Sequence, residues 1–147
     1  DPVRYDIDCI DVIEGSAPKH PDHLERGDRV YRIDEPRTVF LSADDSKIFQ
    51  EAKRIRLKDL CNLEYSLPAK YAGNDVGILK QGVRAVQWVS RDSDDAELLM
   101  PDGTTWTGLA ERALIDEPGE MVQLERIGFA RIEKREPGKV SMVFAHR

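Results

Sequence analysis

The chain has 147 residues, which is enough for one domain or for two small ones that share an interface. Its formal net charge of -6 would disfavour a nucleic-acid partner if the charge were evenly spread, because phosphate binding needs clustered Lys and Arg. The charge is uneven. Acids gather at residues 92–97 and 111–120, whereas residues 53–58 are strongly basic and residues 80–91 contain bases without acids. Net charge therefore does not exclude an RNA partner.

The sequence does not indicate disulfide or metal chemistry. Cys9 and Cys61 are far apart and have no CxxC or His-bearing spacing around them, so we expect two small buried thiols. His20 and His23 lie near carboxylates in a Pro- and Gly-interrupted loop, residues 16–27. We interpret them as solvated loop residues and not as zinc ligands, because no third ligand follows at a regular spacing.

Enzyme and membrane signatures are also absent. The sequence contains no GxSxG, GxxxxGK[ST], HExxH or GxGxxG motif, so we expect no catalysis by this chain alone. No apolar run approaches the length of a membrane span and nothing marks export, which favours a cytoplasmic location. The chain opens on Asp1 without a Met and its first residues already have a strand pattern, so we expect a piece of a longer protein.

Short apolar runs that alternate with polar residues, separated by Gly and Pro, predict a mostly β chain. In chain order the predicted strands are residues 5–13, 30–33, 37–41, 53–60, 63–67, 76–80, 83–90, 96–100, 104–109, 122–131 and 140–145.

Turns and helices separate these strands. Residues 34–36 and the Asp-Gly turn at 101–103 predict two hairpins. Ser42 with the acids that follow it predicts the start of a short helix toward Ala52, and residues 108–116 suggest a second helical turn. We interpret Trp88 as a core residue and not as a base-stacking one, because its flanks are apolar.

About ten short strands and at most two short helices indicate an all-β fold, a sandwich or barrel of antiparallel strands. We expect two small antiparallel β-barrels. The first comprises residues 1–74 and is completed by residues 119–147, and the second comprises residues 75–118.

Two of the predicted strands carry planar polar or cationic side chains. Residues 122–131 (VQLERIGFAR) combine the amide of Gln123 with the guanidinium of Arg126, and Gly128 predicts a bulge or a close approach. Amides and guanidinium groups can hydrogen-bond base edges and phosphates. Residues 53–60 (KRIRLKDL) predict a basic strand face, which comprises Arg54, Arg56 and Lys58. A solvated surface would explain both strands as well.

Short motifs along nearly the whole chain resemble one family. In order they are DPV at 1–3, HPDHLERG at 20–27, RIRLKDLCNLEY at 54–65, VQWV at 86–89, MPDG at 100–103, GLAE at 108–111, VQLERIGFARI at 122–132 and FAHR at 144–147. Together they resemble the C-terminal anticodon-binding region of archaeal-type glutamyl-tRNA synthetases, class I enzymes related to glutaminyl-tRNA synthetase. The resemblance implies two β-barrels, in agreement with the strand pattern.

The resemblance also implies roles for particular side chains. In the glutaminyl relatives the Gln and Arg of a QFER motif contact the anticodon, and Gln123 and Arg126 occupy those places. The first Arg of a VRLRN strand reads an anticodon base and matches Arg56, while Lys58 stands at the second Arg. Lys47 is the basic residue nearest to the place of a further base-reading Arg. We expect phosphate contacts from five further basic side chains, which are Lys53, Arg54, Lys80, Arg84 and Arg91.

By this resemblance the chain recognises the anticodon of glutamate tRNA, and glutamine tRNA stays open as a further partner. An N-terminal catalytic domain of the same parent chain, a glutamate–tRNA ligase, would attach glutamate with ATP and Mg. The HIGH and KMSKS signatures of that domain are absent here. We expect no cofactor in this fragment, no DNA partner and no membrane partner.

Three alternatives remain at this stage. The chain could be the corresponding domain of a glutaminyl-tRNA synthetase, or a stand-alone RNA-binding barrel related to the ribosomal protein that binds 5S rRNA. A protein-interaction module is the third, and an exposed apolar patch in place of a basic one would favour it.

Overall fold

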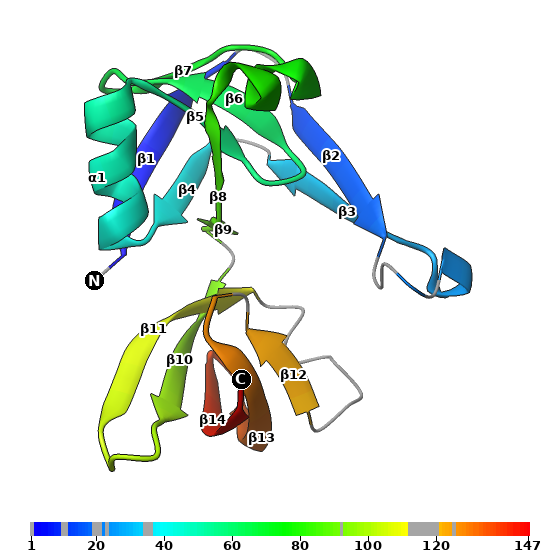
Figure 1. The fold of residues 1–147 in the computed structure, drawn as a ribbon, viewed down its shortest axis with the longest axis vertical. Helices are drawn as coiled ribbons and strands as arrows, with labels where there is room; N and C mark the ends of the chain where they lie inside the picture. Colours follow the sequence, from blue (N-terminus) through cyan, green and yellow to red (C-terminus); the bar gives the residue numbers. More distant parts are fainter. Residues whose placement is uncertain are drawn as a thin grey trace. The chain divides into compact units, whose positions relative to one another are not determined.

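The computed structural model describes residues 2–9, 12–18, 22, 24–33, 37–91, 93–111, 121–124 and 126–147. The chain divides into two compact units, the first unit (Pro2–Ser90) and the second unit (Arg91–Arg147). Figure 1 shows that strands form most of both units. The predicted all-β class with few short helices is therefore confirmed.

The described part of the first unit contains one seven-stranded sheet and one two-stranded sheet. Its strands are β1 (Val3–Asp8), β2 (Ile13–Pro18), β3 (Asp28–Ile33), β4 (Thr38–Leu41), β5 (Arg54–Leu57), β6 (Cys61–Glu64), β7 (Ala69–Tyr71), β8 (Arg84–Val86) and β9 (Val89–Ser90). The larger sheet has the order β8-β5-β6-β7-β1-β4-β9, and β2 pairs with β3. The pairs β1–β7 and β5–β8 are parallel, so the sheet is mixed.

The predicted helix forms where its capping residue indicated. The Ser42 hydroxyl accepts a hydrogen bond from the backbone N–H of Asp45 at 3.1 Å, and α1 follows as Ala43–Ala52. Phe49 on this helix is completely buried, and its ring centroid lies 5.3 Å from that of Tyr5 on β1. The helix therefore contributes to the main core of the first unit.

Two 3-10 helices complete the first unit, η1 (Leu24–Arg26) and η2 (Val76–Gln81). Residues 76–80 were predicted as a strand, and this prediction is wrong. The Asp75 carboxylate accepts a hydrogen bond from the N–H of Gly77 at 2.9 Å and so caps a helical turn. Val76 and Leu79 are exposed, so their apolar pattern does not mark a buried strand face.

The hairpin predicted between residues 30–33 and 37–41 is also wrong. The strand β3 pairs with β2, and β4 pairs with β1. The β1–β4 register places Tyr5 opposite Val39, and both side chains are buried. The pairing of these two buried residues on one face of the sheet therefore outweighs the closeness of β3 and β4 in sequence.

The described part of the second unit contains a five-stranded sheet in the order β11-β10-β14-β13-β12. Its strands are β10 (Ser93–Leu99), β11 (Thr105–Glu111), β12 (Met121–Leu124), β13 (Gly128–Glu136) and β14 (Lys139–His146). The hairpin turn at residues 101–103 is confirmed, and Gly103 has φ 86° there. Of the second helical turn expected at 108–116, residues 108–111 belong to β11 and residues 112–116 lie outside the described part of the chain.

The strand pairing differs from the expected division of the chain. Residues 119–147 were expected to complete the first barrel, but β14 pairs with β13 and with β10, all within the second unit. This pairing places Leu98 beside Met142, and both are buried in the core of the second unit. The apolar face of β14 is thus covered by its neighbours in this unit.

Candidate nucleic-acid interface

Arg56 does not lie on an exposed basic face as expected. It is 6% exposed, and the β5–β6 register places it opposite Asn62 on the same face of the sheet. Its Nη1 donates a hydrogen bond to Asn62 Oδ1 at 2.9 Å, and its Nη2 donates to Asn74 Oδ1 at 3.1 Å. The guanidinium group is thus held by two asparagines, to which the sequence reasoning assigned no role.

The two asparagines connect Arg56 to the start of η2. Asn62 is 1% exposed, and its Nδ2 donates to the carbonyl oxygen of Asp75 at 2.9 Å. The neighbouring Cys61 is buried, and this burial raises the pKa of its thiol to about 12, although the charge of Arg56 opposes the rise. Arg56 therefore has a structural role in joining β5 to the segment that precedes η2.

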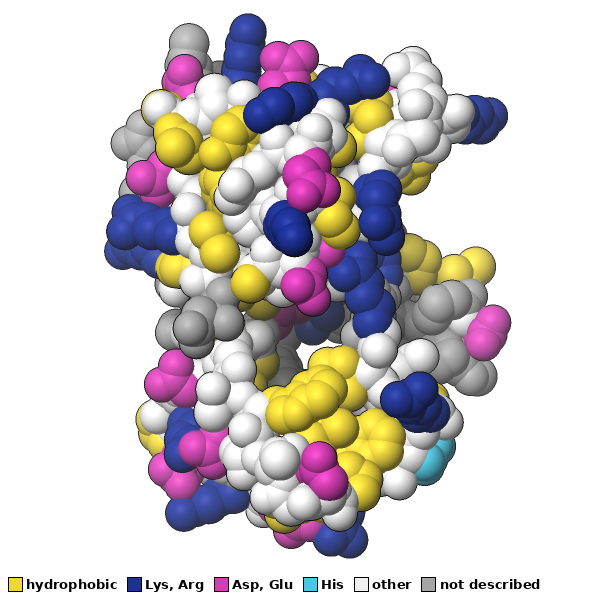
Figure 2. All heavy atoms as spheres, turned by 60° about the vertical axis from the view of Figure 1, so that its left-hand side comes forward, with side chains coloured by type: hydrophobic (Ala, Val, Ile, Leu, Met, Phe, Trp, Pro, Cys, Tyr) yellow, Lys and Arg dark blue, Asp and Glu magenta, His cyan; other side chains and the backbone are white. Residues whose placement is uncertain are grey.

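Several exposed basic side chains lie on other parts of the first unit or beside Arg56 on β5. The parallel register of β5 and β8 places Ile55 opposite Arg84, so Arg54 and Arg84 lie on adjacent strands, and both are exposed. Lys53 follows α1, and its ammonium lies 4.8 Å from the ring centroid of Tyr65. Lys47 and Lys80 are also exposed, on α1 and η2. Figure 2 shows how Lys and Arg side chains alternate with Asp and Glu on one face of the molecule.

Lys58 lies in the turn after β5 and is half-buried. Its backbone N–H donates to the carbonyl oxygen of Val86 at 3.1 Å, and its carbonyl oxygen accepts a hydrogen bond from Trp88 Nε1 at 2.9 Å. Trp88 packs against the main core of the first unit, which confirms the core interpretation of this residue.

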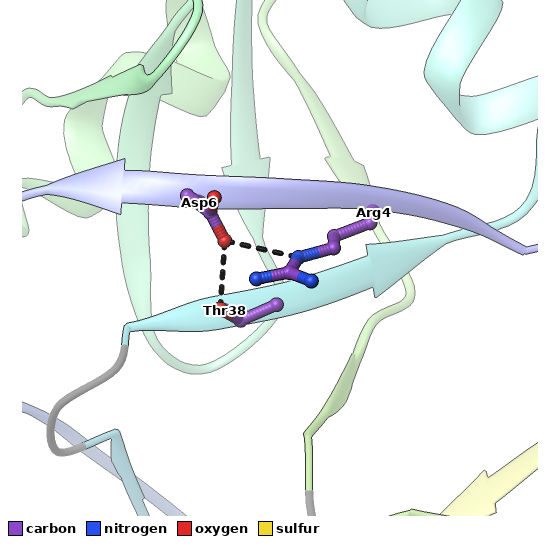
Figure 3. A network of polar contacts seen from close by, with 3 residues as sticks. All are labelled: Arg4, Asp6 and Thr38. Carbon is purple, nitrogen blue, oxygen red and sulfur yellow. Dashed lines mark hydrogen bonds and ion pairs between the residues drawn. The ribbon is translucent and has the colours of Figure 1, made fainter.

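A separate polar cluster joins β1 to β4 (Figure 3). Asp6 Oδ1 accepts hydrogen bonds from Thr38 Oγ1 at 2.7 Å and from Arg4 Nε at 3.2 Å. The Thr38 hydroxyl, and then Arg4, hold the pKa of the Asp6 carboxyl below its ordinary value. Arg4 is therefore engaged in an ion pair on its own strand.

In the second unit, residues 122–131 form a hairpin and not one continuous strand. Ile127 N–H donates to the carbonyl oxygen of Leu124 at 3.0 Å, and Arg126 in this turn has φ 66°. Gly128 follows with φ 140°, and a Cβ on it would lie 2.6 Å from the carbonyl oxygen of His146. The close approach predicted at Gly128 is confirmed.

Gln123 and Arg126 are both exposed but have different neighbours. The register places Gln123 opposite Phe129. Phe129 is in turn opposite His146, and the ring centroids of Phe129 and His146 lie 4.8 Å apart. Arg126 lines a pocket of about 310 Å³ together with Trp106. The sequence reasoning assigned no role to Trp106.

Two further observations concern the described residues only. No group of three or more His, Cys, Asp or Glu among them could hold a metal ion, while His20 and His23 lie outside the described ranges. No helix in the same part of the chain is long and apolar enough to cross a membrane.

Comparisons with known proteins point to one family. Two family models, each described as the anti-codon binding domain of tRNA synthetases class I (E and Q), match residues 1–80 and 85–133. Over its whole length the chain is 33% identical to the glutamate–tRNA ligase of Pyrococcus furiosus and 34% identical to that of Methanocorpusculum labreanum. It is also 33% identical over 90% of its length to the Methanocella arvoryzae enzyme. The chain spans 27%, 26% and 24% of these three relatives, respectively.

Proposed function

Because the chain belongs to the anticodon-binding domain family of the class I tRNA synthetases for glutamate and glutamine, we propose that it binds the anticodon loop of glutamate tRNA. The observation that carries this proposal is the pair of consecutive family matches, which together reach across most of both units. The similarity to archaeal glutamate–tRNA ligases over the whole chain supports glutamate tRNA as the partner.

The proposal places the chemical reaction outside this chain. The chain spans about a quarter of the length of its curated relatives. In this proposal an N-terminal catalytic domain of a parent glutamate–tRNA ligase attaches glutamate with ATP and Mg, in the cytoplasm. The present chain supplies the contacts that select the tRNA.

Recognition of single bases would take place in the second unit at the hairpin that carries Gln123 and Arg126. Anticodon bases are unstacked in their loop, so their hydrogen-bonding edges are accessible to amide and guanidinium groups. Both side chains are exposed and can reach such a base. Each bidentate contact contributes about 1–3 kcal/mol of discrimination between bases, with the values for DNA as a guide.

In the first unit, Arg56 is proposed to read a base from a fixed position. Asn62 and Asn74 already hold its guanidinium, so little side-chain freedom remains to be lost on binding. Asn74 is exposed, whereas Arg56 is only 6% exposed, so a ligand can contact only a small part of the Arg56 side chain. A base that contacts Arg56 would therefore also contact Asn74.

The exposed basic side chains are proposed to bind phosphates and not bases. Phosphate contacts position the RNA without reading its sequence. Arg54 and Arg84 lie on adjacent strands about 5 Å apart, but Arg84 is opposite Ile55, so the two side chains point to different faces and would bind different phosphates. The full proposed phosphate-binding set is Lys53, Arg54, Lys80, Arg84 and Arg91, while Lys47 and Lys58 stay candidate anticodon contacts.

The test is the binding of this chain to a labelled anticodon stem-loop of glutamate tRNA, measured by fluorescence anisotropy at two salt concentrations. A second hairpin has the same stem and loop length but replaced anticodon bases. We expect tighter binding to the first hairpin and loss of this preference in Arg126→Ala. The matched control is Arg131→Ala, because Arg131 is already ion-paired with Glu133. Equal affinity for the two hairpins would contradict anticodon reading.

A further inference from the structure

Trp106 is an exposed aromatic side chain at an edge of the second unit's sheet. It lies on the edge strand β11 and is 51% exposed. The β10–β11 register places it opposite Leu98, which is itself beside Met142 on β14. Trp106 therefore projects from the same sheet face as the core of the second unit.

The surroundings of Trp106 form the pocket of about 310 Å³. Its apolar wall continues the core of the second unit, since Ile127 and Phe144 both pack against that core. Two cationic side chains, Arg126 and Arg147, also line the pocket, and no carboxylate is among the described residues that line it. Among the described residues, the lining consists of Met100, Pro101, Trp106, Arg126, Ile127, Phe144 and Arg147. Figure 2 shows that hydrophobic side chains gather on one surface of this unit.

The indole of Trp106 differs in hydrogen bonding and exposure from that of Trp88, the other tryptophan of the chain. Trp88 donates its N–H to the carbonyl oxygen of Lys58 and packs against the core. Within the described residues, the Trp106 N–H makes no hydrogen bond, and its ring is half exposed. Its polar tip and its flat face are thus both accessible to a ligand.

The composition of the pocket identifies the chemistry of its ligand. A flat aromatic surface stacks well on another flat ring, and two guanidinium groups favour an anionic ligand. A purely apolar segment would make no use of the two guanidinium groups of Arg126 and Arg147, whereas an acidic peptide would leave the indole face uncovered. A nucleotide matches both the indole face and the guanidinium groups, because it joins a planar base to a phosphate.

We propose that Trp106 is a stacking platform for one unstacked nucleotide of the bound RNA, whose polar edge and phosphate are bound by Arg126 and Arg147. This inference rests on the proposed function and adds to it a contact from β11, a strand that the hairpin of Gln123 and Arg126 does not include. Gln123 points to the opposite side of β12 from Val122 and Leu124, which pack against the core. The base on Trp106 is therefore reached through Arg126 and not through Gln123.

The chain contains two tryptophans, so intrinsic fluorescence can report on Trp106. In Trp88→Phe the only indole left is that of Trp106. We expect titration with the anticodon stem-loop of glutamate tRNA to quench this fluorescence, because a stacked base quenches indole emission. If Trp88→Phe does not fold, as judged by circular dichroism, the difference between wild type and Trp106→Phe gives the same signal.

The affinity for the stem-loop provides a second readout, which is independent of the fluorescence of Trp106. We expect Trp106→Ala to weaken stem-loop binding about tenfold or more, and Trp106→Phe to retain most of the affinity, since a phenyl ring also stacks. The matched control is Leu99→Ala, because Leu99 is 43% exposed and lies on the other face of β10. We expect this variant to bind like the wild type.

The outcomes separate the two proposals. Base-dependent binding without quenching, and with full affinity in Trp106→Ala, would overturn the role of Trp106 and leave anticodon recognition intact. Binding that ignores the anticodon but still quenches Trp106 would overturn anticodon recognition and support a nucleotide pocket for RNA in general. The absence of any binding by anisotropy and of any quenching would overturn both.

Discussion

The guanidinium Nη1 of Arg56 lies 2.9 Å from the side-chain oxygen of Asn62, and both residues are almost completely buried in the first unit. A residue that resembles a base-reading arginine is thus also part of the packing of the fold. The proposed base contact can be tested apart from this packing because the second partner of Arg56, Asn74, is exposed.

We expect Arg56→Ala to lower the free energy of unfolding by about 1–3 kcal/mol, because it leaves the buried Asn62 oxygen without its donor. Asn74→Ala should cost less than about 1 kcal/mol, since the exposed group it removes can be replaced by water. Urea denaturation of both variants measures the difference. Equal stabilities of the two variants would show that Arg56 is not held as the structure indicates.

We expect Arg54→Ala and Arg84→Ala to weaken binding to both stem-loops alike. Each should reduce the slope of log affinity against log salt by about 0.7–0.9, since each removes one phosphate contact. Lys134→Ala is the control, because its ammonium already lies 2.6 Å from the Glu136 carboxylate. An unchanged slope in Arg84→Ala would remove this residue from the phosphate-binding set.

Gly128→Ala should lower the free energy of unfolding by about 2–4 kcal/mol, because the added Cβ meets the His146 carbonyl oxygen and the backbone has φ 140°. Gly108→Ala in the same sheet is the control, since a Cβ there has no heavy atom within 4 Å. Its effect should stay within about 0.5 kcal/mol. Thermal or urea denaturation compares the two, and similar losses would refute the close approach.

The turn between β10 and β11 should weaken in acid. Hydrogen bonds from the Thr104 hydroxyl at 2.6 Å, and then from its backbone N–H at 3.0 Å, hold the pKa of Asp102 below its ordinary value. A carboxylate with a lowered pKa stabilises the fold fully above the pKa of the unfolded chain, about 3.9, and this stabilisation is lost as the pH falls through the lower pKa of the folded state.

We therefore expect Thr104→Val to destabilise the chain at neutral pH and to have a smaller effect in strong acid, at a pH below the folded-state pKa of Asp102, where the carboxyl is protonated. Thr105→Val, one residue along and exposed on β11, serves as the control. Urea denaturation at both pH values measures the two differences. A Thr104→Val effect that is the same at both pH values would contradict the role of the ionised carboxylate.

Cys61 should resist alkylation in the folded chain. Its pKa of about 12 leaves very little thiolate at about pH 8, so iodoacetamide should react roughly a thousandfold or more slowly than with an unperturbed cysteine. Mass spectrometry of the Cys61 peptide, with and without urea, measures this protection. Rapid labelling without urea would show that the side chain is not buried.

Several features of this protein follow from short stretches of sequence, because their causes are local. Ser42 caps α1 through a hydrogen bond within one turn, and Asp102 and Gly103 form their hairpin turn with the conformations that these residues favour. Gly128 within the strand pattern also predicted a close approach, although the carbonyl oxygen that it meets belongs to His146 on β14. The family was evident from motifs spread along the chain, and the comparisons confirm it.

Other features were decided by the tertiary structure. Alternation alone placed Arg56 on an exposed face with Arg54, whereas the pairing of β5 with β6 and the approach of Asn74 bury it. The partners of β3 and β4 likewise depend on which apolar faces cover each other, and short-range patterns do not contain that information. The sequence pattern around Trp106 indicates only an aromatic residue in a strand. The sheet places it in one pocket with Arg126 and Arg147, which are distant in sequence. Local hydrogen bonds and turn preferences can be read from the order of residues, but burial and the assembly of a pocket arise only when distant strands pair.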